Sequence, residues 1–306
     1  MAQEPRAITH WPGNPISYTT TRMELFFNEQ LLSTGTAFIM MYAGCYGLVT
    51  NWHVLSGRNP IDGTCLSKTG GIPNIAKFHV ALAHRVDDGP KYIETVHFRA
   101  LEIPLFDEED RAIWFDNRVN DPLSDYAIIM LDQFVPELKQ AGYSLRAIHA
   151  GIVTLKRGVE AAERVRTEDI NHFYPPVGHP VFVVGYPAGI ENAGVFPIWK
   201  GGTIASEPTS SLILAGVETQ DVIYVDGLTR SGMSGSPVIC LQKPGDVYFT
   251  DDGVKITTQK EEPMLIGVYA GRDGVTSSEA DLALGRAWKV AAVERLFGAS
   301  ISTSEG

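Results

Sequence analysis

The stretch Ser231-Gly-Met-Ser-Gly-Ser-Pro237 decides how the rest of this chain is interpreted. Serine and glycine alternate here directly before an apolar run, Val238 to Leu241, that is typical of a buried strand. Small neighbours would let another backbone approach the Ser234 hydroxyl, and the amides of Gly232 and Ser234 would be able to stabilise a developing oxyanion. Glycine and serine also form ordinary turns, so this stretch alone leaves both interpretations open.

A serine hydroxyl is a weak nucleophile unless a base removes its proton. His53 is the best candidate among the eight histidines, because it follows the β-rich run Tyr46-Gly-Leu-Val-Thr-Asn-Trp52 and would be held rigidly at the end of a buried strand. A base in turn needs a carboxylate that orients it. Asp125 opens the apolar run that ends at Leu131, where it would be partly shielded from water, and Asp116 is a weaker rival.

Chain order narrows these candidates to one arrangement. No histidine follows Ser234, the last being His179, which excludes the order nucleophile, acid, histidine of the α/β-hydrolases. No aspartate precedes His53, the first being Asp62, which excludes the subtilisin order. The remaining order is His53, Asp125, Ser234, which is that of the chymotrypsin type.

The rest of the chain predicts many short strands and few helices. Among 306 residues there are 30 glycines and 18 prolines, which punctuate short apolar or β-branched runs. The expected strands are residues 23–27, 37–42, 46–50, 97–103, 127–131, 181–184, 212–214, 222–225, 238–241 and 265–270. Short helices are expected at residues 135–141 and 159–166, the second with a charged loop as the alternative, and a longer helix at residues 286–298. The class predicted is all-β.

Charge and composition exclude several classes of function. The chain carries 36 acidic and 25 basic residues, a net charge of −11, which argues against binding nucleic acid through bulk charge. No apolar run reaches the length of a membrane span. Cys45, Cys65 and Cys240 are far apart and lack metal-ligand spacing, so we expect no metal or cofactor and a reducing, cytoplasmic location.

Three blocks in this order resemble the chymotrypsin-like (trypsin-fold) serine peptidases, most closely the disulfide-poor bacterial branch that includes the HtrA-type enzymes. They are Gly35-Thr-Ala-Phe38 with Leu48-Val-Thr-Asn-Trp-His-Val54, then Asp125 to Leu131, then Gly232-Met-Ser-Gly-Ser-Pro-Val238. The resemblance implies two six-stranded antiparallel β-barrels with a C-terminal helix and a site between the barrels. Too few residues follow the nucleophile block for a PDZ domain.

The resemblance also implies the boundaries of one peptidase unit. These are an N-terminal arm (1–20), a first barrel (21–140), a crossover (141–175), a second barrel (176–285) and a C-terminal helix (286–298). The stretch between His53 and Asp125 and the stretch Gln242 to Pro263 exceed what such barrels need and are expected to be loop insertions.

Roles follow by resemblance at matching positions. Ser234 would be the nucleophile, His53 the general base and acid, and Asp125 the group that fixes the histidine tautomer; Gly232 and Ser234 would supply oxyanion-hole amides. The primary pocket would be formed by Leu228, Thr229, Ala270, Gly271 and Arg272. Leu228 in place of an acidic residue disfavours cleavage after Lys or Arg. A small or apolar side chain is the expected substrate residue, and an acidic one bound by Arg272 or Arg286 is the alternative.

The sequence therefore predicts a serine endopeptidase that acts on a protein or peptide substrate and is controlled by a regulatory partner or by ordering of the loop from Leu228 to Met233. Two alternatives stay open: an idle binding or scaffold module on the same fold, and an esterase-like or unrelated β protein. Neither nucleic acid nor a membrane is an expected partner.

Overall fold

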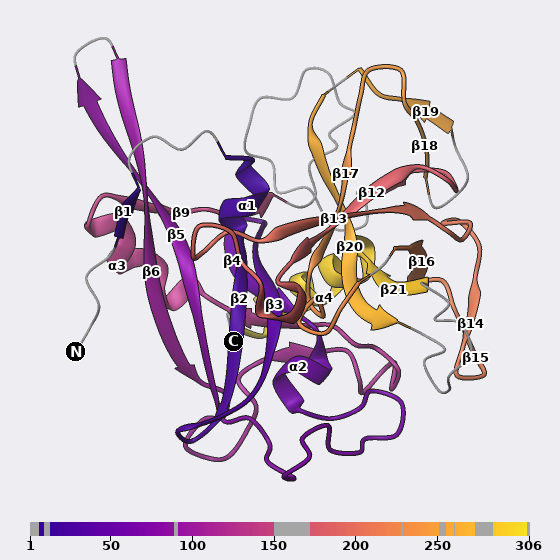
Figure 1. Cartoon of the computed structure of the whole chain (residues 1–306), viewed down its shortest axis with the longest axis horizontal. Coiled ribbons are helices and arrows are strands. Elements are labelled where there is room, and N and C mark those ends of the chain that lie inside the picture. Colours follow the sequence, from indigo (N-terminus) through magenta and orange to yellow (C-terminus); the bar gives the residue numbers. More distant parts are fainter. Residues whose placement is uncertain are drawn as a thin grey trace.

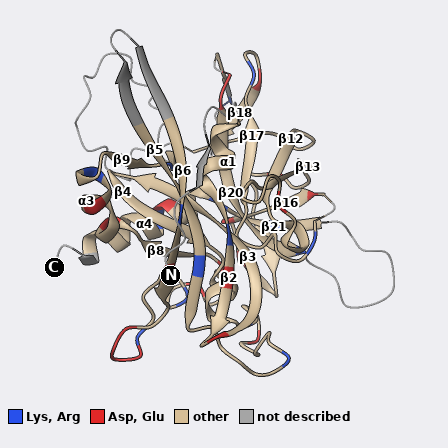
Figure 2. Cartoon of the chain, turned by 60° about the vertical axis from the view of Figure 1, so that its left-hand side comes forward, with Lys and Arg blue, Asp and Glu red and all other residues tan. Residues whose placement is uncertain are grey.

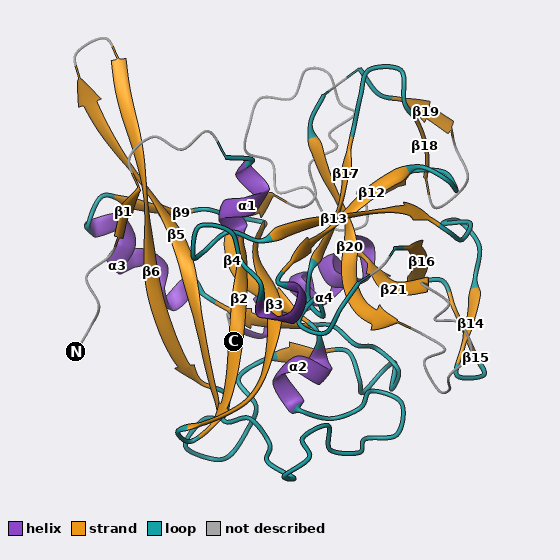
Figure 3. Cartoon of the chain, in the orientation of Figure 1, coloured by secondary structure: helices purple, strands orange, loops and turns teal. Residues whose placement is uncertain are grey.

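The computed structural model describes residues 6–8, 13–88, 91–149, 172–227, 229–250, 255–259, 261–272 and 284–304. The chain is mostly β, as predicted. Figure 1 shows the N-terminal strands on one side of the molecule and the later strands on the other, with the last helix beside the later strands. Figure 3 shows how much of the lower part of the molecule, around a short helix, consists of loops.

The first half is one large sheet. Its strands are β1 (Arg6–Ile8), β2 (Thr20–Phe27), β3 (Gln30–Tyr42), β4 (Cys45–Thr50), β5 (Ile75–Asp88), β6 (Lys91–Pro104), β7 (Phe115–Asp116), β8 (Ala127–Met130), β9 (Tyr143–Leu145) and β10 (Ile148–His149). The path runs β1-β6-β5-β2-β3-β4-β8-β7, with β9 on β5 and β10 parallel to β3. Among the described residues these strands pair as a ten-stranded sheet, more strands than the six expected for the first barrel. The long β5–β6 hairpin contributes to this larger sheet. It is paired along its whole length and lies in the stretch between His53 and Asp125 that was predicted as a loop insertion.

The second half contains the predicted six-stranded barrel. Its strands are β12 (Pro180–Gly185), β13 (Ile198–Ile204), β16 (Val222–Asp226), β17 (Pro237–Leu241), β20 (Pro263–Arg272) and β21 (Leu284–Lys289). They close in the order β12-β13-β16-β21-β20-β17, with antiparallel neighbours throughout. Outside the barrel lie the hairpin of β14 (Leu212–Leu214) and β15 (Val217–Thr219), and a small sheet of β11 (Phe173–Tyr174), β18 (Val247–Thr250) and β19 (Lys255–Thr257). The predicted insertion at residues 242–263 thus contains paired strands.

The helices are short except the last. They are α1 (Pro15–Thr19), α2 (Trp52–Ser56), the 3-10 turn η1 (Asp132–Phe134), α3 (Val135–Gln140), the 3-10 turn η3 (Pro187–Gly189) and α4 (Val290–Ser304). The C-terminal helix was placed four residues too early, because residues 286–289 pair with β16 and β20 as part of β21. The arm predicted at residues 1–20 contains β1 and α1. The helix expected at residues 159–166 lies outside the described residues.

The two halves share one apolar core. Phe38 and Ile128 of the first sheet pack in the same buried cluster as Val238 of the barrel and Phe297 of α4. Gly47 of β4 shows how closely α4 approaches, since a Cβ there would lie 2.7 Å from the Phe297 ring. The halves are therefore held against each other by apolar contacts that run through β4, β8 and α4.

Figure 2 colours Lys and Arg blue and Asp and Glu red along the backbone, and segments of both colours are interspersed in that view. Among the described residues, no helix combines the length and apolar character needed to cross a membrane.

Candidate active site

His53, which is half-buried, and Asp125, which is fully buried, form a hydrogen-bonded pair. Asp125 has no exposed surface, and its Oδ2 lies 2.7 Å from His53 Nδ1. Its other oxygen, Oδ1, accepts a hydrogen bond of 2.9 Å from the His53 amide. Because both carboxylate oxygens contact the same residue, they fix the ring orientation and favour a proton on Nδ1. Nε2 is then the nitrogen that is able to accept a proton.

Strand pairing brings these two residues together. β4 and β8 are antiparallel neighbours with Thr50 opposite Ala127, so the end of β4 and the start of β8 lie at the same edge. Asn51 follows β4 and donates from Nδ2 to the Asp125 carbonyl over 2.6 Å. His53 then lies in the first turn of α2, not at a strand end as the sequence suggested.

The loop that carries Ser234 depends on two glycines in the left-handed region. Gly232 has φ 91° and Gly235 has φ 86°, values that side-chain-bearing residues rarely adopt. A Cβ at Gly232 would lie 2.5 Å from the Tyr186 carbonyl oxygen. A Cβ at Gly235 would lie 1.9 Å from the Thr36 carbonyl oxygen. The alternation of serine and glycine therefore reflects both backbone conformation and close approach of neighbouring chain.

Hydrogen bonds from outside the loop hold three of its carbonyl groups. The Ala188 amide donates to Ser231 O over 2.7 Å. Thr36 donates from its amide to Ser234 O over 2.8 Å and from Oγ1 to Gly232 O over 2.7 Å. Within the described part of the chain, the amides of Gly232 and Ser234 donate to no other group. Two unused amides beside a serine hydroxyl are suitable donors to an oxyanion.

His53 and Ser234 line one cleft of about 210 Å³ that opens to solvent. Between described residues, Ser234 Oγ and His53 Nε2 form no hydrogen bond, and the His53 ring contacts Asp125 through Nδ1. Catalytic hydrogen bonds are often formed only when substrate is bound. The same cleft is also lined by Leu32, Thr34, Leu66, Ser67, Gly71 and Pro73.

The residues predicted for the primary pocket separate into different environments. An ideal Cβ at Gly271 would lie 4.0 Å from Ser234 Oγ, so Gly271 adjoins Ser234. Thr229 is buried, and its hydroxyl pairs with the Tyr269 hydroxyl. Ala270 is buried and Arg272 half-buried, and neither contributes to the cleft that contains His53. Leu228 lies outside the described residues.

Sequence reasoning missed the residues that support the site. Thr36 lies 196 positions from the carbonyl that its hydroxyl contacts, and Ala188 contacts the loop through its backbone. Asn51 lies within the histidine block, but no supporting role was predicted for it. Among the described residues, no group of three or more His, Cys, Asp and Glu side chains is arranged to hold a metal ion.

Comparisons with known proteins give structural matches only. No family model and no curated protein matches the sequence. The Rv3671c protease from M. tuberculosis in its active form is 16% identical over 92% of this chain and 81% of that chain, with a TM-score of 0.41. Deg5 is 16% identical over 91% and 87%, with a TM-score of 0.41. A serine endoprotease from Yersinia pestis is 13% identical over 94% and 67%, also with a TM-score of 0.41. At such low identities and scores, the function rests on the geometry of the site.

Proposed function

We propose that this protein is a serine endopeptidase that cleaves protein or peptide substrates through an acyl-enzyme intermediate. The observation that carries the proposal is that His53, paired with the buried Asp125 carboxylate, lines one cleft with Ser234, and that two amides of the Ser234 loop donate to no other group among the described residues. Each group has the chemistry that one step of acyl transfer needs.

The steps assign a role to each residue. Ser234 Oγ attacks the substrate carbonyl carbon while His53 Nε2 takes the hydroxyl proton, and Asp125 stabilises the imidazolium. The amides of Gly232 and Ser234 donate to the oxyanion. When the scissile C–N bond breaks, His53 gives its proton to the leaving amine. Water, deprotonated by His53, then attacks the acyl ester, and the acid product leaves as Ser234 regains its proton.

Substrate binding follows from the two sides of Ser234. We propose that the acyl side of the substrate lies beside Gly271, near Ala270, Arg272, Thr229 and Leu228, and that a small or apolar side chain is preferred there. The cleft beyond His53 receives the leaving-group side, because His53 delivers the proton to that side. Leu66 is 52% exposed and would offer this segment an apolar contact.

A fluorophosphonate probe, which bonds to activated serines, tests the proposal. We expect the wild-type chain to be labelled, and Ser234→Ala and His53→Ala to lose labelling while keeping their fold. Labelling that persists in Ser234→Ala, at another serine, would contradict the assigned nucleophile. Turnover of small esters without cleavage of any peptide would favour the esterase-like alternative.

An idle scaffold is the second candidate, and the absence of a Ser234–His53 hydrogen bond between described residues favours it. We therefore also propose control of the site by a partner protein or by ordering of the loop from Leu228 to Met233. Labelling in cell lysate but not in the isolated chain would indicate a partner. Failure of a folded wild-type chain to react in either would favour the scaffold.

We further propose a cytoplasmic location, on the basis of the three widely spaced cysteines. Localising the tagged full-length chain in intact cells by fractionation tests this point, and recovery in an oxidising compartment would contradict it.

A further inference from the structure

Thr36 connects three parts of the molecule through one buried hydroxyl. It lies on β3 in the first half, and its side chain has no exposed surface. Oγ1 donates to the Gly232 carbonyl over 2.7 Å and accepts from the Tyr186 amide over 3.2 Å. A hydroxyl has one proton to donate, so this arrangement uses it on the nucleophile loop and uses a lone pair on the turn that follows β12.

The turn beginning at Tyr186 holds the other side of the same loop. Ala188, which has the uncommon φ of 52° for a side-chain-bearing residue, donates its amide to Ser231 O over 2.7 Å. Because a peptide group is planar and trans, a carbonyl of Ser231 that points toward Ala188 directs the Gly232 amide to the opposite side. The direction of that amide is what an oxyanion hole requires.

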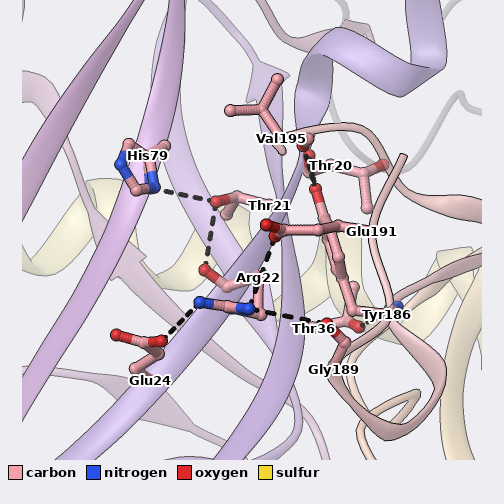
Figure 4. A network of polar contacts seen from close by, with 10 residues as sticks. All are labelled: Thr20, Thr21, Arg22, Glu24, Thr36, His79, Tyr186, Gly189, Glu191 and Val195. Carbon is pink, nitrogen blue, oxygen red and sulfur yellow. Dashed lines mark hydrogen bonds and ion pairs between the residues drawn. The ribbon is translucent and has the colours of Figure 1, made fainter. Parts of the chain in front are cut away.

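The turn itself is anchored to the first half (Figure 4). The Tyr186 hydroxyl lies 3.0 Å from the Thr20 carbonyl of β2 and 2.7 Å from the Val195 carbonyl. Burial raises the pKa of Tyr186 above its usual value, so the phenol keeps its proton and remains a donor. Gly185 permits the approach of the turn, since a Cβ there would lie 2.8 Å from Thr36 Oγ1.

We propose that Thr36 is a positioning residue whose hydroxyl orients the Gly232–Met233 peptide and thereby the oxyanion-donating amides beside Ser234. This inference rests on the proposed function, since it names the residue that orients the oxyanion-donating amides of the proposed active site. Without the hydroxyl, the buried Gly232 carbonyl has lost its donor, and a glycine at φ 91° has the freedom to rotate toward another one. The backbone bond from Thr36 N to Ser234 O would remain, so the loop would stay attached but would lose its defined peptide orientation.

The test uses full-length variants that separate the effect of losing the Thr36 hydroxyl from the effect of changing the volume of its side chain. Thr36→Val keeps the shape and loses the hydroxyl, whereas Thr36→Ser keeps the hydroxyl. Thr21→Val is the matched control, since Thr21 is also a buried threonine with a hydrogen-bonded hydroxyl on the neighbouring strand β2. Two readouts are compared: the second-order rate constant of fluorophosphonate labelling, and hydrogen exchange of the segment 229–236 measured by mass spectrometry.

We expect Thr36→Val to label about 10- to 100-fold more slowly, less than the full loss of an oxyanion donor would cost. Thr36→Ser is expected to recover to within about threefold of wild type, and exchange of segment 229–236 is expected to be faster in Thr36→Val alone. Labelling and exchange of Thr36→Val equal to wild type would overturn the proposal, as would an equal loss in Thr36→Ser or Thr21→Val. If Thr36→Val does not fold, Thr36→Ala, which adds no methyl group beside the carbonyl, takes its place.

The exchange measurement separates this inference from the proposed function. A wild-type chain that never labels, with exchange still faster in Thr36→Val, would refute the peptidase and keep the positioning role of Thr36. A labelled wild-type chain with unchanged exchange and rate in Thr36→Val would refute the positioning role and keep the peptidase.

Discussion

The two halves of the candidate site are built in different ways. His53 and Asp125 contact each other directly, through a side-chain pair and a backbone amide from adjacent ends of β4 and β8. Ser234 depends instead on glycine conformations and on donors from distant elements. The acid–base pair is therefore formed by its own residues, whereas the nucleophile loop is formed by its surroundings.

The largest expected effect concerns the acid–base pair. Asp125→Asn would keep the hydrogen-bonding shape but would present an amide to His53 and favour the wrong tautomer, so we expect labelling and turnover to fall about 10⁴-fold. Asp116→Asn is the control, because Asp116 was the rival carboxylate and the structure pairs its side chain with Trp114. Measured rates that fall in Asp116→Asn and not in Asp125→Asn would reverse the assignment.

Gly235→Ala tests whether close packing against neighbouring backbone, in addition to backbone conformation, requires glycine in the Ser234 loop. The new Cβ would meet the Thr36 carbonyl at 1.9 Å and would also carry the left-handed φ, so we expect a loss of more than about 2 kcal/mol in the free energy of unfolding. Gly245→Ala is the control, since it has φ 94° with nothing within 4 Å of its Cβ, and should lose about 1 kcal/mol. Urea unfolding measures both, and equal losses would show that conformation alone constrains Gly235.

The same contrast explains what the sequence was able to predict. Short apolar runs between polar or turn-forming residues identified β4, β8 and β17, and chain order selected His53, Asp125 and Ser234 as candidates. The local sequence pattern gave a wrong prediction where long-range strand pairing determines the structure. Residues 286–289 have helical spacing, but they pair with β16 and β20 as part of β21 and complete the barrel. Thr36 lies in the block Gly35 to Phe38, but its contact with the loop could not be predicted, because the partner is 196 positions away in the sequence.

Leu66 tests the cleft beyond His53, where a smaller effect is expected. Leu66→Ser would remove an apolar contact for the leaving-group side, so we expect KM for peptides with an apolar residue there to rise about threefold to tenfold at nearly constant kcat. Ile61→Ser is the control, because Ile61 is 56% exposed and lies outside the cleft lining. A fall in kcat with unchanged KM would instead place Leu66 in support of the acid–base pair.

The smallest effect on labelling is expected from the ion pairs that Arg22, in the N-terminal half of the molecule, forms next to the turn that follows β12. Arg22 on β2 contacts Glu24 at 2.6 Å, Glu191 at 3.4 Å and the Gly189 carbonyl at 3.5 Å, beside the turn that holds the Ser234 loop (Figure 4). The pairs are about one-third exposed, so water screens them and each contributes less than about 1 kcal/mol. Arg22→Met should therefore keep labelling within about twofold of wild type, and a double-mutant cycle with Glu191→Gln should give a coupling below about 1 kcal/mol. If Arg22→Met slowed labelling as much as Thr36→Val, surface ion pairs would position the turn as strongly as buried hydrogen bonds do. That result would contradict the conclusion that the hydroxyls of Thr36 and Tyr186 are the main groups that hold the turn and the Ser234 loop in place.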